Sequence, residues 1–567
     1  MRPTRRSMLT MLLSSPLAGC RPAQGTSAPK PAQPSPSGRP NASMIVRGGD
    51  VWTLDPARPR ARALAIRDGV IVAVGDESEV EGLRSPSTVV LDAGGGTVTP
   101  GLVDAHAHLV GLGESLATVD LRGAESTQEV VRRLQAGAPA KGWVVGRGWD
   151  QNLWPEASMP THHPLTQAFP DRPVWLRRVD GHAAWGNAAL LRESGIGPNT
   201  PTPSGGEILR DSSAAATGVL IDTAMELVSV PQPSPADLRS RIEAAQEHIL
   251  ERGLTGVHDM GIGSGTDAAY RRMASDSEAL RIRVHAYAAE SWFMQDLQGQ
   301  APDPLLRGSR YALAGVKVYA DGALGSRGAA LLHPYADRAG HRGLMQHDEA
   351  ALRRIVVAAM RGGWQVATHA IGDAGNRTVL DVYEHALGEA PRRDPRPRIE
   401  HCQLLDTSDI PRFAELGVIA SMQPTHATSD MGWVAERVGV SRLAGAYAWR
   451  SLLDADAHLC FGSDFPVELP DVTHGLYAAI TRRDATGAPE GGWLADQRVS
   501  LDRAVRGFTQ EAAYAVHREE ELGQIKVGMQ ADLTCFGRLL DEQEPARIRD
   551  APVLGTIVGG RPHHWAG

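Results

Sequence analysis

Two histidines in the segment Gly101-Leu102-Val103-Asp104-Ala105-His106-Ala107-His108 are spaced for joint metal binding. The apolar run before them is typical of a buried β-strand. Side chains two positions apart on a strand point to the same face, so both imidazoles can bind one ion. The spacing alone is not specific, because two polar residues on the solvent side of a strand show the same pattern.

Three later segments also end an apolar run with a side chain of a metal-binding type. Ala367-Thr368-His369 and Ile399-Glu400-His401 end in histidine, and Phe461-Gly462-Ser463-Asp464 ends in aspartate. Several strands that each end in a ligand indicate the rim of a (β/α)8 barrel, where enzymes of that fold carry their active sites. The set therefore predicts a metal centre, although each segment alone does not.

The elements that must position these side chains lie between residues 101 and 515. Strand-like segments alternate there with helical ones such as 236–251 and 349–362, which is the order of a parallel βα fold. The barrel requires eight strands, and the candidates are 102–108, 254–260, 282–288, 316–320, 365–369, 398–401, 418–422 and 458–464. Residues 110–250 exceed one βα unit, so we predict an inserted subdomain over the barrel mouth, where specificity loops lie.

Both flanks of the barrel region are rich in strand-like segments. Residues 44–100 contain several, one of them directly after the turn dipeptide Asp68-Gly69. Similar strand-like segments recur within residues 516–567. This predicts one small β-sandwich built from both termini, although two separate β pieces would have the same pattern. The predicted fold class is α/β: a (β/α)8 barrel with an insertion after strand 1, plus the terminal β-sandwich.

The bulk composition is that of a soluble globular protein. The 567 residues, of which 42% are hydrophobic and 22% charged, are ample for a large core and more than one domain. The net charge of −8 and the lack of a basic stripe argue against nucleic-acid binding. The four cysteines form no Cys-x-x-Cys pair, which argues against a zinc–thiolate site.

Residues 1–20 have the features of an export signal. Arg2, Arg5 and Arg6 form a basic start before a short apolar stretch. The segment 4–9 resembles a twin-arginine signal, and Leu17-Ala18-Gly19-Cys20 resembles a lipobox, in which Cys20 is lipidated. About ten apolar residues are too few for a membrane span, which needs roughly twenty. The alternative is an ordinary cleaved signal with an incidental cysteine.

Residues 21–43 are rich in proline, serine and alanine. This composition cannot build a core and predicts a semi-extended linker. Together with a lipid at Cys20, it predicts an exported lipoprotein that is anchored to a membrane on its periplasmic side. The sequence leaves open which membrane this is and whether Cys20 is acylated.

Taken together, the motifs resemble those of the amidohydrolase superfamily over roughly residues 44–567. They are the segment 99–108, a lysine on the fourth strand in Lys317-Val318-Tyr319-Ala320-Asp321-Gly322, the two single histidines, and Gly462-Ser463-Asp464-Phe465-Pro466. Finer features resemble the branch that contains N-substituted formamide deformylase. They are Gly146-Arg147-Gly148-Trp149-Asp150 and Asp180-Gly181-His182-Ala183-Ala184-Trp185-Gly186-Asn187.

The resemblance implies a site for two divalent ions, expected to be Zn²⁺. The implied ligands are His106, His108, Lys317 and Asp464 for one ion, and Lys317, His369 and His401 for the other. An ammonium group has no lone pair to bind a metal, so Lys317 would act as a carbamate that forms with CO₂ and bridges both ions. A water between the ions would be acidified to hydroxide at neutral pH, and Asp464 would accept its proton.

The implied activity is hydrolysis of a non-peptide carbon–nitrogen bond, in an amide or N-substituted formamide, by a metal-activated hydroxide. A deaminase on the same barrel is the main alternative and would need neither a second ion nor the lysine. A cyclic-amide or lactone hydrolase is another. A lipoprotein that only binds a small ligand should lack a metal ligand or the base, whereas here every position is filled.

Four further residues are candidate substrate contacts, with a supporting role as the alternative for each: Arg147, Trp149, His182 and Asp321. The sequence identifies neither the substrate nor the oligomeric state, for which a homodimer is one option.

Overall fold

The computed structural model describes residues 41–566 except residues 139, 230–232, 277 and 390–393. The predicted export signal, Cys20 and most of the linker therefore lie outside the described residues. Among those that are described, no helix is both long and apolar enough to cross a membrane.

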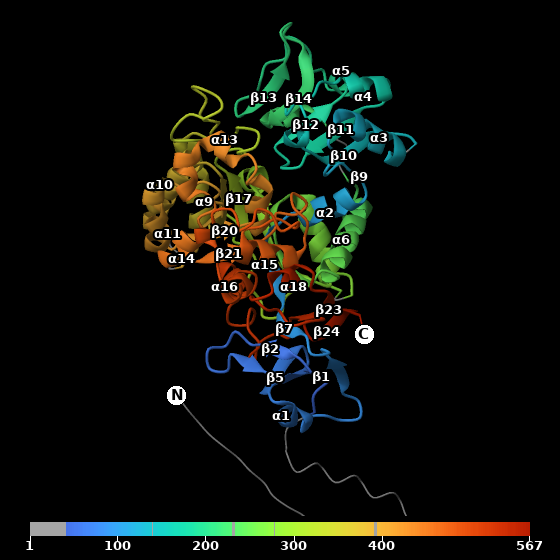
Figure 1. Cartoon of the computed structure of the whole chain (residues 1–567), viewed down its shortest axis with the longest axis vertical. Helices are drawn as coiled ribbons and strands as arrows, with labels where there is room; N and C mark the ends of the chain where they lie inside the picture. Colours follow the sequence, from blue (N-terminus) through green and yellow to red (C-terminus); the bar gives the residue numbers. More distant parts are fainter. Residues whose placement is uncertain (1–40, 139, 230–232, 277, 390–393, 567) are drawn as a thin grey trace, which may run out of the picture. The chain divides into compact units, whose positions relative to one another are not determined.

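Eight parallel strands form the central sheet, and their order in the sheet follows the chain. They are β8 (Leu102–Ala107), β15 (Leu254–Ile262), β16 (Arg283–Ala289), β17 (Tyr311–Tyr319), β18 (Gln365–Ala370), β19 (Arg398–His401), β20 (Ile419–Met422) and β21 (Leu459–Phe461). Three of them, β17, β20 and β21, are labelled in Figure 1. Each strand of the sheet overlaps a predicted strand, although β17 begins at Tyr311 instead of residue 316. The predicted (β/α)8 fold class is confirmed.

The barrel closes between β8 and the residues that follow β21. The Asp464 amide donates to the His106 carbonyl at 2.8 Å, and the His108 amide donates to the Phe465 carbonyl at 2.9 Å. The Ser463 hydroxyl donates to Asp104 Oδ2 at 2.6 Å. Closure of the barrel thus brings Asp464 against the two histidines of β8.

Helices cover the barrel, and α6 (Pro235–Leu250) shows how the sequence forms one. Ser234 and Asp237 make a capping box, and Pro235 occupies the first turn. A single helix face is buried, with Leu238, Ile242, Ala245 and Ile249. Further helices of the barrel region are α2 (Leu109–Leu116), α7 (Ser264–Ala274), α9 (Glu349–Arg361), α10 (Asp373–Glu389), α11 (Ile410–Leu416), α12 (Pro424–Asp430), α14 (Trp449–Asp454), α15 (Val472–Thr481), α16 (Leu501–Gly507) and α17 (Gln510–Ala515).

The insertion folds around a six-stranded sheet of its own, in the order β13-β14-β12-β11-β10-β9. The strands are β9 (Val119–Asp120), β10 (Val144–Trp149), β11 (Val174–Arg178), β12 (Ala183–Gly186), β13 (Gly206–Arg210) and β14 (Ala216–Asp222). Helices α3 (Thr127–Gly137), α4 (His163–Ala168) and α5 (Ala188–Glu193) lie between them. Trp149, Trp154 and Trp185 pack against one another in its core, with ring centroids 5.9–6.0 Å apart.

The β-sandwich combines strands from both ends of the chain, as predicted. One sheet is N-terminal and contains β5 (Val70–Gly75), β4 (Ala63–Arg67), β1 (Met44–Arg47) and β6 (Val89–Asp92). The other contains β24 (Arg561–Trp565), β23 (Val553–Val558), β22 (Leu533–Phe536), β7 (Thr97–Pro100), β2 (Asp50–Trp52) and β3 (Arg60–Ala61). Strands β7 and β22 pair antiparallel, and one apolar core that includes Leu64, Val98 and Leu533 joins the two sheets.

Candidate metal centre

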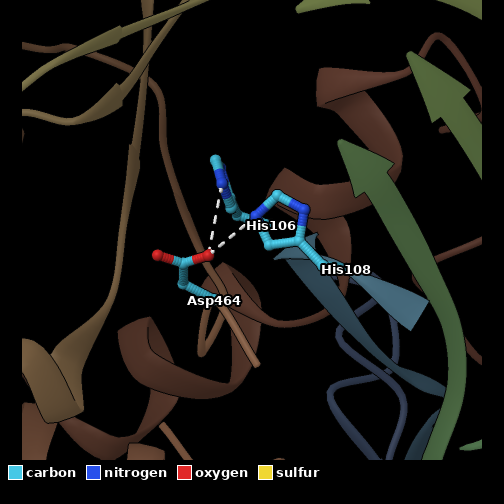
Figure 2. Close-up of side chains that lie close together, drawn as sticks. All are labelled: His106, His108 and Asp464. Carbon is cyan, nitrogen blue, oxygen red and sulfur yellow. Dashed lines mark ion pairs between the residues drawn. The ribbon is translucent and has the colours of Figure 1, made fainter. Parts of the chain in front are cut away.

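His106, His108 and Asp464 converge at the carboxyl end of the barrel (Figure 2). Asp464 Oδ1 lies 3.6 Å from His106 Nε2 and 3.1 Å from His108 Nε2. One donor atom from each residue lies within 4.8 Å of the others. Two imidazole nitrogens and a carboxylate oxygen form a donor set that suits zinc.

A second group of three possible ligands shares Asp464. Its Oδ2 atom lies 4.0 Å from His401 Nδ1 and 3.9 Å from His426 Nε2. The sequence did not predict His426, which lies on the short helix α12 and not at a strand end. The signal that could have found it is its position soon after the seventh predicted strand, in Gln423-Pro424-Thr425-His426.

His369 completes the ring of predicted imidazoles. The His401 ring lies between the other two, with its centroid 4.6 Å from that of His106 and 4.6 Å from that of His369. His369 Nε2 lies 3.4 Å from the Gly322 carbonyl, which leaves the lone pair of Nδ1 free to bind a metal. The structure therefore brings all four predicted histidines and Asp464 together.

Three of these histidines have an acceptor beside Nδ1. His106 faces Glu400 Oε2 at 2.6 Å, His108 faces the Met260 carbonyl at 3.0 Å, and His401 faces Gln423 Oε1 at 2.9 Å. A proton on Nδ1 leaves the lone pair on Nε2. Such outer partners are typical of metal-binding histidines.

Burial keeps the imidazoles of His106, His369 and His401 neutral. It lowers the pKa of His106 to about 4, and the Lys317 charge acts in the same direction. Burial also lowers the pKa values of His369 and His401 well below the usual value. Neutral imidazole is the form that binds metal.

Lys317 projects from β17 into the cavity that the candidate metal ligands line. Its Nζ atom is buried and has no hydrogen-bond partner among the described residues. The nitrogen lies 4.9 Å from the centroid of the Tyr319 ring. Burial lowers the Lys317 pKa to about 8, and the charges of Glu400 and Asp464 oppose this only partly. An unpartnered buried amine is costly, so its environment suits an added group.

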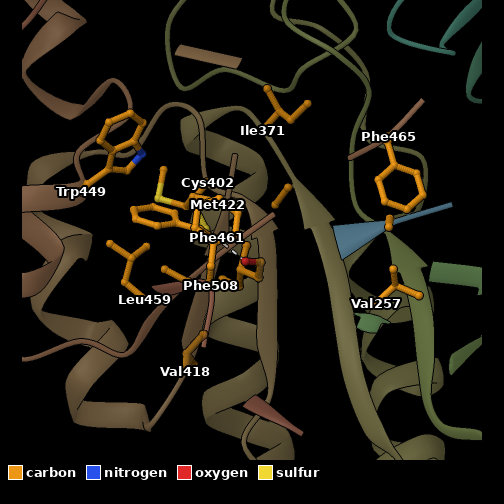
Figure 3. Packing of buried hydrophobic residues seen from close by; sticks show 14 of the residues in the cluster. Val257, Ile371, Cys402, Val418, Met422, Trp449, Leu459, Phe461, Phe465 and Phe508 are labelled. Carbon is orange, nitrogen blue, oxygen red and sulfur yellow. Dashed lines mark hydrogen bonds between the residues drawn. The ribbon is translucent and has the colours of Figure 1, made fainter. Parts of the chain in front are cut away.

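His401 and Asp464 adopt left-handed backbone conformations, with φ values of 77° and 59°. Such conformations cost about 1–3 kcal/mol each and persist where the surroundings enforce them. The chain on either side of Asp464 is held by apolar packing that includes Phe461 and Phe465 (Figure 3). Phe465 is fully buried, and Phe461 packs with its ring centroid 5.7 Å from that of Phe508.

A cavity of about 670 Å³ opens between the barrel and the insertion. The metal-binding candidates His106, His108, Lys317, His369, His401 and Asp464 all line it. A second cavity of about 570 Å³ also reaches His369, His401 and Asp464. The centre is thus accessible to a small molecule.

Two of the four predicted substrate contacts line the larger cavity, namely Arg147 and His182. His182 Nδ1 lies 2.7 Å from Asp222 Oδ1, and the His182 ring centroid lies 5.1 Å from that of His369. His182 therefore faces the centre from the insertion.

The other two candidates, Trp149 and Asp321, line neither cavity, which favours the supporting role that was their alternative. The Trp149 ring is fully buried in the core of the insertion and donates to the Leu176 carbonyl at 2.9 Å. Asp321 is fully buried and accepts hydrogen bonds of 2.9 Å from the amides of Ala330, Ile371 and Gly372. Burial nevertheless raises its pKa to about 7. Asp321 holds the loops around β17 and β18 together.

A (β/α)8 barrel with imidazole and carboxylate donors at its carboxyl end defines a metal-dependent hydrolase. The chain belongs to the Amidohydrolase family, whose model matches residues 89–564. The prediction of an amidohydrolase, a hydrolase class that acts on carbon–nitrogen bonds outside peptides, is confirmed at the level of the family.

Named relatives span nearly the whole chain. Protein LONG AFTER FAR-RED 3 of Arabidopsis thaliana is 33% identical over 92% of this chain and 91% of its own. N-substituted formamide deformylase of Arthrobacter pascens is 29% identical over 91% of this chain and 97% of its own. Among solved structures, an uncharacterized metal-dependent hydrolase from Pyrococcus horikoshii is similar with a TM-score of 0.72. It is 29% identical, and the match covers 92% of this chain and 100% of that one.

Proposed function

We propose that this amidohydrolase cleaves the carbon–nitrogen bond of a small non-peptide amide, with N-substituted formamides as the first class to test. The observation that carries the proposal is that four imidazoles, Asp464 and the unpartnered Lys317 amine line one cavity. The similarity to N-substituted formamide deformylase supports the substrate class.

The residues fit two Zn²⁺ ions. His106, His108 and Asp464 would hold the first, and His369 and His401 the second, while a carbamate on Lys317 would serve both. With its pKa at about 8, Lys317 has a fraction of neutral amine at neutral pH. That amine adds to CO₂ and releases one proton, which yields an anionic carboxylate on Nζ.

Metal bound here would acidify a water molecule and polarise the carbonyl oxygen of the substrate. Asp464 would accept the proton of the attacking water at Oδ1, an atom that has no hydrogen-bond partner among the described residues. It would then pass that proton to the leaving amine nitrogen. Glu400 and Gln423 keep His106 and His401 oriented, and the insertion covers the reacting atoms.

Metal analysis and a substrate panel test this function. We expect about two equivalents of zinc per chain and hydrolysis of N-substituted formamides or simple amides by the zinc-loaded protein. One equivalent, with ammonia release from an amino-substituted ring, would favour the deaminase. Hydrolysis of cyclic amides or lactones alone would show that the substrate is cyclic and not a linear amide.

We also propose that the protein is exported and anchored by a lipid at Cys20. The supporting features are the basic start with Arg5 and Arg6 and the lipobox-like segment. Cys20→Ser should release the protein from membranes, because the acyl chains supply the anchor. Lysine at both Arg5 and Arg6 should instead leave precursor in the cytoplasm. A Cys20→Ser protein that still sediments with membranes at high salt would contradict the lipid anchor.

A further inference from the structure

The insertion forms a wall of the larger cavity through alternate residues of two neighbouring strands. On β10, Val145 and Arg147 line the cavity, and on β11, Trp175 and Arg177 do so. The strands are parallel and in register, with Val145 beside Trp175 and Arg147 beside Arg177. Since side chains two positions apart share a face, this wall has an apolar part and a part with two guanidinium groups.

Neither guanidinium has a carboxylate partner. Among the described residues, no carboxylate oxygen lies within 4 Å of Arg147 or Arg177, whereas Arg178 of the same strand pairs with two. Arg178 lies 2.5 Å from Asp180 and also contacts Asp150. The sheet thus pairs the arginine on its other face directly with carboxylates, whereas Asp464 and Asp180 act on Arg147 only from a distance.

The two groups also converge. A Cβ atom added at Gly181 would lie 3.5 Å from Arg177 Nη2 and 3.8 Å from Arg147 Nη1. Each arginine donates one hydrogen bond to a backbone carbonyl, Arg147 to Val179 and Arg177 to Gly181. The buried Nε of Arg147 has no partner among the described residues. Most of the donors of the pair therefore remain available.

Side-by-side cations on adjacent strands repel each other. Burial and, next, the Arg177 charge lower the Arg147 pKa to about 10. Two acids of the same cavity are already engaged, because Asp180 pairs with Arg178 and Asp222 with His182. A bound anion would relieve the repulsion and use the free donors.

We propose that Arg147 and Arg177 form a carboxylate-binding subsite, and that the substrate is an amide that bears a carboxylate beside an apolar group. Paired guanidiniums match the planar carboxylate geometrically. The apolar group would lie on Val145 and Trp175, on the same wall. The reaction at the amide rests on the function proposed above, whereas anion binding by the arginines does not.

Two formamides that differ only in the carboxylate test the subsite. N-formylphenylalanine carries it, and N-(2-phenylethyl)formamide lacks it. We expect the zinc-loaded enzyme to favour the first in kcat/KM by about 10- to 100-fold, the range of a charge-assisted hydrogen bond. Added salt should reduce this preference, since screening weakens a partly exposed ion pair. Equal kcat/KM values for the two compounds would overturn the proposal.

Variants assign the preference to the pair. The combined change Arg147→Met and Arg177→Gln should bring the two kcat/KM values close together, because it should lower that of N-formylphenylalanine far more than that of the neutral formamide. Arg177→Gln alone keeps the buried arginine and should give an intermediate ratio. Arg192→Gln is the matched control, because it removes one exposed positive charge from the insertion at a residue that lines neither cavity. Equal losses for both formamides would mean that the arginines only hold the 179–181 turn.

Direct binding separates the subsite from the proposed reaction. Calorimetry with 3-phenylpropanoate should show affinity that the double variant loses by about tenfold or more and that Arg192→Gln retains. If no amide is hydrolysed but this binding pattern is observed, the proposed reaction is contradicted and the proposed subsite is supported. If formamides are hydrolysed while 3-phenylpropanoate binds the double variant as tightly as the unaltered enzyme, the subsite falls.

Discussion

Two buried polar clusters lie one above the other inside the barrel, and they differ in how many of their hydrogen-bonding groups have a partner. In the lower cluster, Arg398 donates to Glu400 Oε1 at 2.9 Å, to the Tyr287 hydroxyl at 3.0 Å and to the Ser421 hydroxyl at 2.9 Å. It also contacts His258 Nδ1 and the Ala105 carbonyl. In the upper cluster, Lys317 Nζ, His426 Nε2 and Asp464 Oδ1 have no hydrogen-bond partner among the described residues.

The difference separates structure from function. The lower cluster, whose hydrogen-bond donors and acceptors all have partners, needs no bound ligand. The unpartnered groups of the upper cluster mark a place where metal and substrate can bind. Glu400 joins the two levels, because it accepts from Arg398 and lies 2.6 Å from His106 Nδ1. The lower cluster thereby orients a ligand of the upper one.

The largest effect is expected from Asp464→Asn in the upper cluster. The amide cannot accept a proton, so kcat should fall by roughly 10³-fold or more, while thermal unfolding of the metal-free protein should change little. Steady-state kinetics and calorimetry measure the two effects. Retention of more than about a tenth of the activity would remove Asp464 from the base role.

Arg398→Met should break the lower cluster and have the opposite signature. It leaves Glu400 buried without its ion-pair partner, so the free energy of unfolding should fall by about 3–5 kcal/mol. Denaturant titration of metal-free protein measures this. A fall of less than about 1 kcal/mol would show that the lower network is not the structural one.

Lys317→Met should sharpen the contrast. Removal of an unpartnered buried amine should leave the metal-free protein as stable or more stable, since an apolar side chain suits burial better. Bound zinc, however, should fall from about two equivalents toward one, and activity with it. Full metal content in this variant, measured by elemental analysis, would exclude Lys317 as a ligand.

The smallest effect is expected from Gln423→Met, which removes the acceptor beside His401 Nδ1. Loss of such an outer partner typically weakens metal binding about 10- to 100-fold, and we expect the lower end because Gln423 is neutral. Competition with a chelator measures the affinity. Since both residues are uncharged at this contact, stability should change far less than in Arg398→Met, and unchanged zinc affinity would contradict the orienting role.

The sequence was sufficient for the parts of the centre that are local. The predicted ligands lie in or just after apolar strands, near their carboxyl ends, and the barrel topology alone brings such ends together. His426 lacks this signal because it lies on a helix after β20. Arg177 becomes a candidate for substrate binding only because it pairs in register with Arg147. No local sequence pattern reveals that pairing.

Trp149 and Asp321 take a supporting position for one physical reason. Trp149 and Asp321 lie in the motifs that carry the family resemblance, but a motif does not specify which way a side chain points. Trp149 faces the core of the insertion, and Asp321 turns to three backbone amides. Residue type near an active site therefore predicted proximity but not contact.

The strand pairing across the chain ends has a kinetic consequence. Thr99 donates to the Thr534 carbonyl although the two residues are 435 positions apart. Contacts of such long range form late, because closing a long loop is entropically costly and slow. During synthesis β7 must wait for β22 with an open edge, and an open edge invites aggregation. A chain truncated before β22 should thus accumulate as insoluble protein even though every residue of the metal centre is present.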